Sequence, residues 1–531
     1  MESTEHDFDK YLDFVVQRKL LLPPFYHAIA FLFGTLSLYL IADAINNLFF
    51  HPLANVPGPL INRISKIPWD YWQWSGRLPQ RTAEVHLKYG HVVRIAPNEL
   101  SFTNQEAWHD IFAKVPGREQ WPRHPRRVPQ GKGGPKSIMN TTGSEHARFR
   151  RLLNYAFSEK GLQEQQKIIT KYIDFFIDKV AGFAQTGETI NITDWLVMVG
   201  FDVISDLGWS EPFNCIEKGE VHPWMQTFAQ TAFDSQMKFL FREHSLMWLA
   251  PYCTPKRFQL ARLNNFKYAR NRIEDRIQNG GIRGDFWDRI DIKSADDNAS
   301  GEGLTKAEMV VSAVTLVGTG SETISTLLTG LVYFLGTNPH AMKKLVEEIR
   351  TTFSSADEVD HLSVHGLKYL TACLEETMRL YPPVTTLLWR VPPKGGGHTN
   401  GLYIPEGTGC NMSLRGIALS PDYFHRPYDF CPERFLANPP AEFKNEDHKP
   451  YHPFSVGAYN CLGQNLANAE SRLIITKLLL NYNIHLDKNT PKDWTDQLSW
   501  AVFVKNPSIS LFLADKRCEG ELDLADHSKE K

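Results

Sequence analysis

One cysteine in this chain stands in a setting that suits iron ligation. Residues 454–463 place Cys461 in a glycine-containing loop that leads into an amphipathic helix. Backbone N–H groups and the positive end of a following helix stabilise a thiolate. Gly457 and Gly463 allow a tight turn and a close approach by a flat ligand. The pattern therefore predicts that Cys461 is the axial thiolate of a haem iron; the alternative is a buried structural cysteine.

A second pattern is a charged pair on a helix. Glu376 and Arg379 are three residues apart in a helical run that ends at Tyr381-Pro382-Pro383. Residues at this spacing lie on one helical face, so the carboxylate and the guanidinium can meet. Such a pair on a surface contributes little to stability. Arg434, within Pro432-Glu433-Arg434-Phe435, supplies a second arginine before the cysteine loop.

A third pattern lies in the apolar run 309–335, where Thr319-Gly320-Ser321-Glu322-Thr323 combines small residues with an acid and an alcohol. A glycine inside a helix costs about 1 kcal/mol relative to alanine, so Gly318 and Gly320 require a reason. The alternative to a functional acid–alcohol pair is an amphipathic core helix with one satisfied acid.

Taken together, these motifs resemble those of the cytochrome P-450 superfamily. The cysteine loop resembles Phe-x-x-Gly-x-Arg-x-Cys-x-Gly, with matches at Phe454, Gly457, Cys461 and Gly463, and with Tyr459 where Arg or His is usual. Glu-x-x-Arg and Pro-Glu-Arg-Phe follow in the family's order. The resemblance implies a haem b cofactor bound through Cys461 and a network of Glu376, Arg379 and Arg434 that locks the cysteine segment.

The resemblance also implies roles in oxygen chemistry for the apolar helix. Glu322 and Thr323 match the acid and the alcohol that relay protons to oxygen, and Gly320 matches the groove beside the iron. Thr319 and Ile324 depart from the family's pattern, in which Ala or Gly and a second alcohol are usual. These departures keep oxygen-free chemistry open as an alternative.

Basic side chains are expected at the haem carboxylates, because guanidinium groups pair bidentately with carboxylates. By resemblance these are Arg390 on a strand, and His146 and Arg150 one turn apart on a helix. Tyr459 offers one neutral hydrogen bond where arginine would offer a charged fork, so binding should depend more on the other three.

Composition describes one large folded unit. The chain has 531 residues, 42% hydrophobic and 22% charged, and a net charge of −2, so nothing points to nucleic acid. Its 7 widely spaced cysteines indicate a reducing compartment. Periodicity predicts a mainly α fold with small β-sheets, and the resemblance implies that this is the cytochrome P-450 fold. Helices are expected at residues 159–184, 194–207, 223–241, 255–278, 305–336, 339–353 and 462–480, and strands at 91–95, 99–102 and 402–404, with a loop at 288–303.

The amino terminus differs from the rest. Residues 25–42 are almost wholly apolar and long enough to cross a bilayer, and prolines follow. We expect an N-terminal segment at residues 1–24, a transmembrane anchor at 25–50, a proline-rich hinge at 51–68, a haem-thiolate catalytic domain at 69–515 and a disordered tail at 516–531. The resemblance implies a single-pass protein of the endoplasmic reticulum membrane with a cytosolic catalytic domain.

The implied activity is a monooxygenase that inserts one oxygen atom from O2 into a bulky apolar or aromatic small molecule. Trp224, Phe228, Phe233, Phe239 and Trp500 are the aromatic residues expected near such a ligand. Electrons would come from NADPH through a separate flavoprotein reductase. Phrases near residues 51–59 and 92–100 resemble filamentous-fungal members that modify secondary metabolites. The alternatives are oxidative phenol coupling, isomerisation or dehydration at the same haem, or a haem sensor without turnover.

Overall fold

The computed structural model describes residues 26–127, 134–290, 292–293, 303–386, 389–492, 494–496, 498–500, 503–504 and 508–515, with the backbone alone at 226–233, 261–262, 292–293 and 503–504. The predicted N-terminal segment at 1–24 and the tail at 516–531 lie outside these residues.

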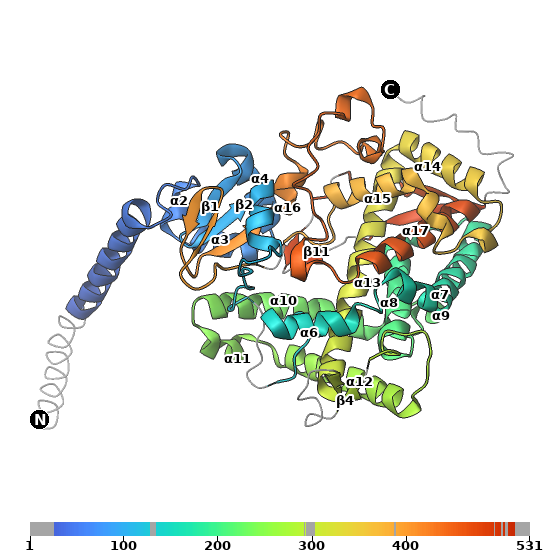
Figure 1. Cartoon of the computed structure of the whole chain (residues 1–531), viewed down its shortest axis with the longest axis horizontal. Coiled ribbons are helices and arrows are strands. Elements are labelled where there is room, and N and C mark those ends of the chain that lie inside the picture. The colour runs from blue at the N-terminus through green and yellow to red at the C-terminus, as the bar shows by residue number, and fades with distance from the viewer. Residues whose placement is uncertain are drawn as a thin grey trace, which may run out of the picture.

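The described chain is mainly helical, as the periodicity predicts (Figure 1). The long helices are α6 (Gly143–Leu153), α7 (Glu159–Thr186), α8 (Ile192–Trp209), α10 (Pro223–Glu243), α12 (Lys256–Asn279), α13 (Lys306–Thr337), α14 (Pro339–Thr352), α15 (Lys368–Leu380) and α17 (Gln464–Asn481). Shorter ones are α2 (Leu60–Ile64), α3 (Ile67–Trp74), α4 (Leu78–Tyr89), α5 (Gln105–Ala107), α9 (Cys215–Lys218), α11 (Ala250–Cys253) and α16 (Leu414–Ala418).

Small sheets complete the fold. One sheet has the order β1-β2-β8, with β1 (Val92–Ala96) antiparallel to β2 (Glu99–Phe102) and β2 parallel to β8 (Gly409–Met412). A second has the order β3-β12-β9, from β3 (Ile190–Asn191), β12 (Ser510–Asp515) and β9 (Tyr482–Leu486). Two-stranded pairs join β4 (Ile292–Lys293) to β5 (Leu304–Thr305), β6 (Gly397–Thr399) to β7 (Leu402–Ile404), and β10 (Ser499–Trp500) to β11 (Phe503–Val504).

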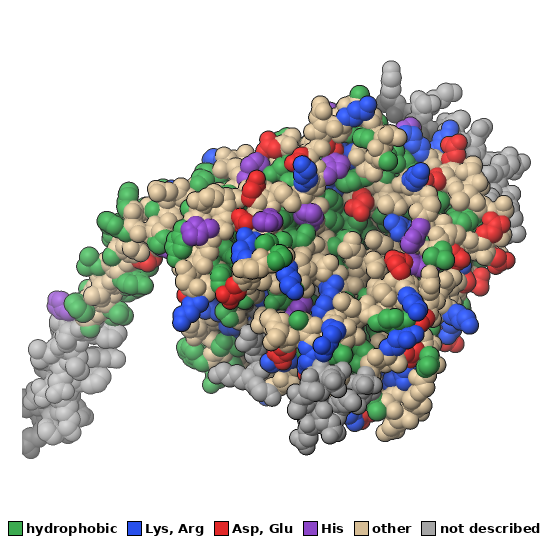
Figure 2. All heavy atoms as spheres, viewed as in Figure 1, with side chains coloured by type: hydrophobic (Ala, Val, Ile, Leu, Met, Phe, Trp, Pro, Cys, Tyr) green, Lys and Arg blue, Asp and Glu red, His purple; other side chains and the backbone are tan. Residues whose placement is uncertain are grey.

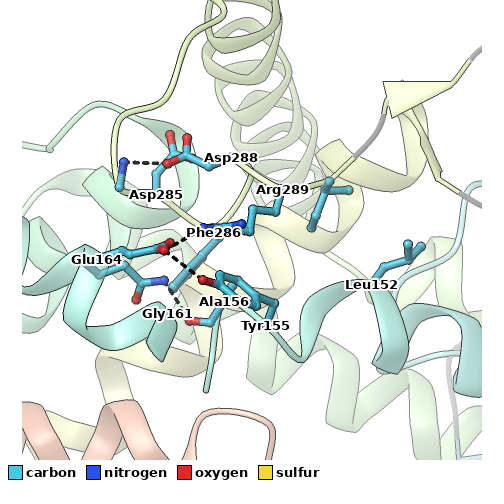
Figure 3. Close-up of a pocket in the computed structure, with 12 residues that line it drawn as sticks. Leu152, Tyr155, Ala156, Gly161, Glu164, Asp285, Phe286, Asp288 and Arg289 are labelled. Carbon is cyan, nitrogen blue, oxygen red and sulfur yellow. Dashed lines mark hydrogen bonds and ion pairs between the residues drawn. The ribbon is translucent and has the colours of Figure 1, made fainter. Parts of the chain in front are cut away.

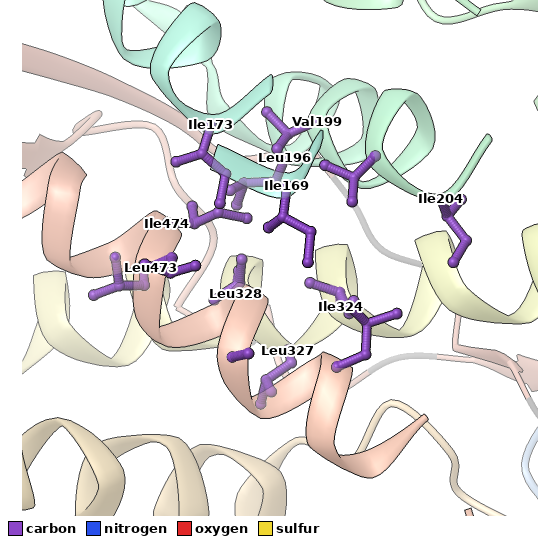
Figure 4. Close-up of a cluster of buried hydrophobic side chains, with 14 of the residues drawn as sticks. Ile169, Ile173, Leu196, Val199, Ile204, Ile324, Leu327, Leu328, Leu473 and Ile474 are labelled. Carbon is purple, nitrogen blue, oxygen red and sulfur yellow. The ribbon is translucent and has the colours of Figure 1, made fainter. Parts of the chain in front are cut away.

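Helix α13 lies at the centre of the main core. It begins with a capping box, in which the Thr305 hydroxyl accepts from the Glu308 N–H and the Glu308 carboxylate accepts from the Thr305 N–H. Most of its side chains from Ser325 onward are buried. Figure 4 shows apolar side chains of α7, α8, α13 and α17 packed together, among them Leu196, Leu328 and Ile474. This packing fixes the position of α13 relative to α17, the helix that follows Cys461.

Glycine lets α8 and α13 approach closely. A Cβ atom at Gly320 would lie 2.9 Å from Ile204 of α8, and one at Gly208 would lie 2.9 Å from Val317 of α13. Real Cβ atoms do not approach carbon so closely. The sequence predicts that Gly320 opens a groove beside the iron; the structure gives another reason, which is contact between two core helices.

The apolar amino-terminal helix projects from the globule (Figure 1). It spans Tyr26–Phe50, and an 18-residue stretch of it has a mean hydropathy of 1.9 with 0% of its residues buried, so it is long and apolar enough to cross a membrane. Figure 2 shows hydrophobic side chains over its described part. Within the described residues, this is the one helix suited to membrane anchoring.

The segment predicted as a hinge packs against the first sheet. Leu53 and Val56 are buried, and the buried Arg94 of β1 donates to the carbonyl of Asn47, 2.7 Å away. A Cβ atom at Gly58 would lie 2.2 Å from the Arg94 carbonyl oxygen. Part of the predicted hinge therefore packs closely against the globular domain.

Candidate active site

The loop that carries Cys461 is closed by its own backbone. The Cys461 N–H donates to the Phe454 carbonyl at 2.9 Å, and Gly457 has a φ of +78°. A Cβ atom at Gly457 would lie 2.2 Å from the Phe112 carbonyl oxygen, so only glycine fits there. At Gly463, by contrast, a Cβ atom would meet nothing within 4 Å. The first glycine fixes the loop, and the second leaves open space beside the cysteine.

The Cys461 thiol is accessible on one side and surrounded by protein on the others. Burial raises the pKa of the thiol, while a hydrogen bond from the Gly463 N–H and the charge of Arg150 oppose this rise. Helix α17 begins at Gln464, directly after the loop. The thiol thus lies at a helix N-terminus with one side accessible, where a bound metal cation would favour its thiolate form.

Arg390 is the clearest sign of an absent anion. Its side chain is 2% exposed, and its Nε and Nη1 have no hydrogen-bond partner among the described residues. Burial, and then the charge of Arg123, lower the pKa of Arg390 to about 9. A buried guanidinium without an anion is costly, and a carboxylate is the group that its fork binds best. The side chain therefore fits a haem propionate.

A second arginine, Arg123, lies beside it. The two guanidinium groups lie 4.5 Å (Arg123) and 4.3 Å (Arg390) from the centroid of the Tyr459 ring. Arg123 Nη1 donates to the Ile138 carbonyl at 3.0 Å and to that of Met139 at 2.7 Å, and its Nε has no hydrogen-bond partner in the described part of the chain. Sequence reasoning missed Arg123, because this residue lies in a loop without periodicity.

Tyr459 is held between these cations. Its hydroxyl accepts from the Gly143 N–H at 3.2 Å, and its ring centroid lies 4.3 Å from that of His146. Tyrosine at this position therefore stacks on arginines, where the family's arginine would add a third positive charge.

His146 is buried, and burial together with Arg123, Arg150 and Arg390 lowers its pKa to about 4. The ring is neutral at neutral pH, so it can give one N–H hydrogen bond but no ion pair. Arg150 is directed elsewhere: its Nη1 donates to the Asn460 carbonyl at 2.7 Å and its Nε to the Asn154 side chain at 2.8 Å. Arg150 thus holds the residue that precedes Cys461.

The structure brings Glu376, Arg379 and Arg434 together with fully buried side chains. Arg379 donates to the two Glu376 oxygens at 2.7 and 2.8 Å, and Arg434 Nε donates to Glu376 Oε1 at 3.2 Å. The Cys431 N–H donates to the same oxygen at 2.8 Å. Glu446, which the motif does not include, supplies a second carboxylate to Arg434.

This network ties helix α15 to the segment before the cysteine loop. Arg379 Nη1 also donates to the carbonyls of Ala418 at 2.7 Å and Pro427 at 2.6 Å. Two carboxylates and two guanidinium groups balance in charge, which a buried cluster requires. The network is built to hold the cysteine segment.

On α13, the sequence-predicted acid and alcohol lie on the part of the helix that is not fully buried. Thr315, Thr319, Glu322 and Thr323 are partly accessible, although the helix is central. Burial raises the pKa of Glu322 to about 7, and its carboxyl group has no hydrogen bond or ion pair within the described ranges. The Thr323 hydroxyl donates to the Thr319 carbonyl at 2.9 Å, which leaves its oxygen free to accept. The Glu322 carboxyl group can therefore hold a proton near neutral pH, and the Thr323 oxygen can accept a hydrogen bond.

The described aromatic side chains that were expected near a ligand lie in different parts of the structure. Trp224 belongs to the core, where its ring centroid lies 5.2 Å from that of Trp209. Phe239 packs on Trp69 at 5.9 Å, and Trp500 donates to the Trp74 carbonyl at 3.0 Å. The side chains of Phe228 and Phe233 lie outside the described ones. Trp224 thus packs within the core, and its place near a ligand stays a prediction.

A small cleft elsewhere shares no residue with this site. It lies between the end of α6, the start of α7 and the loop after α12, where the Glu164 carboxylate accepts from the Tyr155 hydroxyl at 2.8 Å and from Arg289 at 2.7 Å (Figure 3).

Comparison with known proteins agrees with the geometry. The sequence pattern of the family "Cytochrome P450" matches residues 67–512. The cytochrome P450 monooxygenase vrtK of Penicillium aethiopicum is 73% identical over 472 residues, 89% of this chain and 88% of that protein. A versicolorin B desaturase of Dothistroma septosporum is 39% identical, covering 88% of this chain and 89% of its own. An averantin hydroxylase of the same species is 35% identical, with 89% of each chain covered. The motif order, the cysteine loop and this extended similarity lead to one conclusion: the chain belongs to the cytochrome P450 family.

Proposed function

We propose that this protein is a membrane-anchored haem-thiolate monooxygenase that oxidises the same fungal secondary metabolite as vrtK. The observation that carries the proposal is 73% identity across nearly the whole of both chains. The named relatives at lower identity include a hydroxylase and a desaturase. Both activities begin by removing a hydrogen from carbon, so the reaction class is oxidation of a C–H bond in a bulky apolar or aromatic molecule.

Residues of the site would hold haem b as follows. Cys461 would bind the iron through its thiolate, and the open space at Gly463 would admit the flat ring. Arg390 and Arg123 would bind the propionates through their unpartnered nitrogens, and His146 would give one neutral hydrogen bond. When bound, this group supplies the activation of O2 and the oxidation of the substrate.

The chain's own contribution to the reaction is proton supply. Glu322, with a pKa raised to about 7, would take up a proton at neutral pH and pass it on toward the oxygen site. Thr323 would accept a hydrogen bond at that site, because its own proton is committed to the Thr319 carbonyl. Thr319 and Ile324 would leave this pair intact, since neither replaces its acid or its alcohol.

Electrons would come from NADPH through a separate flavoprotein reductase that docks near the cysteine loop. The helix Tyr26–Phe50 would place the protein in the endoplasmic reticulum membrane with its catalytic domain in the cytosol. Desaturation is a second candidate outcome, favoured by the desaturase that is 39% identical. Hydroxylation and desaturation share the removal of the first hydrogen. They differ in the last step, in which hydroxylation adds a hydroxyl group to the carbon and desaturation removes a second hydrogen.

The test is complementation of a Penicillium aethiopicum strain that lacks vrtK. Expression of this chain should restore the missing oxidised metabolite, and microsomes with reductase should form the same product from NADPH and O2. Incorporation of one 18O atom from labelled O2 indicates oxygen insertion, whereas an unlabelled alkene indicates desaturation. Failure to restore any product, with normal haem content, would refute the shared substrate.

A further inference from the structure

A second group of ligand-type side chains lies outside the haem site. Glu159, His361 and His365 each offer one oxygen or nitrogen atom, and these atoms all lie within 4.8 Å of one another. Neither the family motifs nor the proposed activity uses any of the three residues.

The fold sets the two histidines on one side of a short turn. They are four residues apart, and His365 lies within the 3₁₀ helix η6 (Ser363–Gly366), which precedes α15. Asp360 Oδ1 fixes the turn by accepting from the N–H groups of Leu362 at 2.9 Å and Ser363 at 2.7 Å. The two rings are 5.0 Å apart at 85°. Their relative position is therefore set by the backbone.

The third residue arrives from a different element. Glu159 is the first residue of α7, and the Ser158 hydroxyl caps that helix by accepting from the Gly161 N–H. The Glu159 side chain is 55% exposed, and its Oε2 lies 2.9 Å from His361 Nε2. Two segments about 200 residues apart in the chain thus meet at one point.

His361 is the buried member of the group. Its side chain is 3% exposed, and its Nε2 is the nitrogen that lies 2.9 Å from Glu159 Oε2. Its Nδ1 has no hydrogen-bond partner within the described residues. Nε2 is therefore the atom that His361 would offer to an ion shared with Glu159.

We propose that Glu159, His361 and His365 form a zinc-binding site. Two imidazoles and one carboxylate are a donor set that Zn²⁺ takes, with water as a fourth ligand. With bonds of about 2.0–2.2 Å, the ligand atoms of a tetrahedral zinc lie about 3.3 Å apart. The carboxylate and the imidazole already approach this spacing, so a side-chain rotation at the exposed His365 is the main adjustment that binding requires.

Zinc would link the start of α7 to the turn that leads into α15. Because α15 carries Glu376 and Arg379, the ion would stabilise the same part of the fold as the buried charge network. Arg472 of α17 is close enough to interact with both Glu159 and His365. Zinc must compete with this cation for the carboxylate, which makes the site weaker than a site without a neighbouring positive charge.

The experiment uses the full-length holoenzyme in detergent, freed of metal other than haem iron with a chelator. Zinc chloride is titrated against a chromophoric zinc indicator, and thermal unfolding is measured with and without zinc. We expect one saturable zinc per chain and a higher midpoint of unfolding in its presence. Both effects should be lost in His365→Ala and weakened at least tenfold in Glu159→Gln.

His109→Ala is the matched control, because His109 is also an exposed histidine paired with a carboxylate, that of Asp110. This variant should bind zinc as the parent does. X-ray absorption at the zinc edge then identifies the ligands, and two imidazoles are expected. Zinc bound equally by His365→Ala, sulfur ligation through the exposed Cys253, or no saturable zinc at all would overturn the proposal. None of these results bears on the oxidation that vrtK complementation tests.

Discussion

The two sides of the candidate haem site differ in whether their carboxyl groups have partners. One side is the cysteine segment, and the other is helix α13. Around the cysteine segment, the Glu376 carboxylate accepts from Arg379, Arg434 and a backbone N–H. On α13, the Glu322 carboxyl group has no partner in the described part of the chain. The Glu376 side chain is fully buried, whereas Glu322 is partly accessible and burial raises the pKa of its carboxyl group. Paired groups hold the structure, whereas an unpaired group retains the capacity to act on a ligand.

The same contrast separates the arginines. Arg379 is saturated with acceptors, but Arg390 has two nitrogens without any among the described residues. Arg379 therefore stabilises the fold through contacts within the chain, whereas Arg390 has donors that can bind an anionic ligand. Substitutions on the two sides should therefore fail in different ways.

The largest effect is expected at the cysteine. Cys461→Ser should abolish activity and the red-shifted Soret band of the ferrous–CO form, since a thiolate opposite CO causes that shift. The parent enzyme should show the band, and Cys253→Ser is the control, because Cys253 is also accessible. A parent spectrum with only an imidazole-type band would contradict the assignment of the axial ligand.

Next comes the buried network. Glu376→Ala leaves Arg379 without its carboxylate, and Arg434→Ala leaves Glu446 without its arginine partner, each at a cost of about 3–5 kcal/mol. We expect lower folded yield and haem content, measured by chemical denaturation and by haem absorbance. The exposed pair Arg81–Glu84 is the control, and Glu84→Ala should change stability little. Unchanged stability in both network variants would show that the buried pairs are dispensable.

Glu322→Gln should fold and bind haem but slow turnover by about 10²–10⁴-fold, because it removes the acid that supplies protons. The pKa of Glu322 is raised to about 7 by burial, so the carboxyl group is protonated below this pH and ionised above it. Turnover in the parent should fall as pH rises through about 7, and the variant should lack this step. A pH profile that is the same in both proteins would assign proton supply to another group.

Thr323→Ala should slow NADPH oxidation less than Glu322→Gln does, but it should clearly lower the amount of product formed per NADPH. Loss of the hydroxyl should let reducing equivalents escape as hydrogen peroxide, so product per NADPH falls while substrate binding is retained. Thr329→Ala is a matched control on the same helix, because the Thr329 hydroxyl makes the equivalent bond to the Ser325 carbonyl at 2.7 Å but is fully buried. Equal coupling in the two variants would favour chemistry that does not need O–O cleavage.

The smallest effect is expected at Ile324, which follows Glu322 and Thr323 in the chain. Ile324 is buried in the core cluster shown in Figure 4, so Ile324→Val should cost about 0.5–1.5 kcal/mol of stability. Product per NADPH should stay unchanged, since the side chain packs against helices and not against the oxygen site. A marked loss of coupling would mean that this departure from the family's pattern takes part in the reaction.

The sequence alone determined the helices and the motif residues. Periods of 3.6 residues predicted α7 and α13 within a few residues of their observed ends, because a one-sided apolar pattern is a local property of the chain. The cysteine loop could be recognised for a similar reason: Gly457 is required by its own backbone conformation and by one close contact.

Only the tertiary structure decided which groups meet. Arg123 joins Arg390 at Tyr459, and Glu446 joins Arg434, although no spacing in the sequence connects them. The contact between Gly320 and Ile204 likewise depends on how two helices cross. These pairings are long-range, and their energy comes from burial that exists only once the chain has folded. Residue type and local spacing therefore predicted the chemistry, while packing determined which charges are paired and which remain free for a ligand.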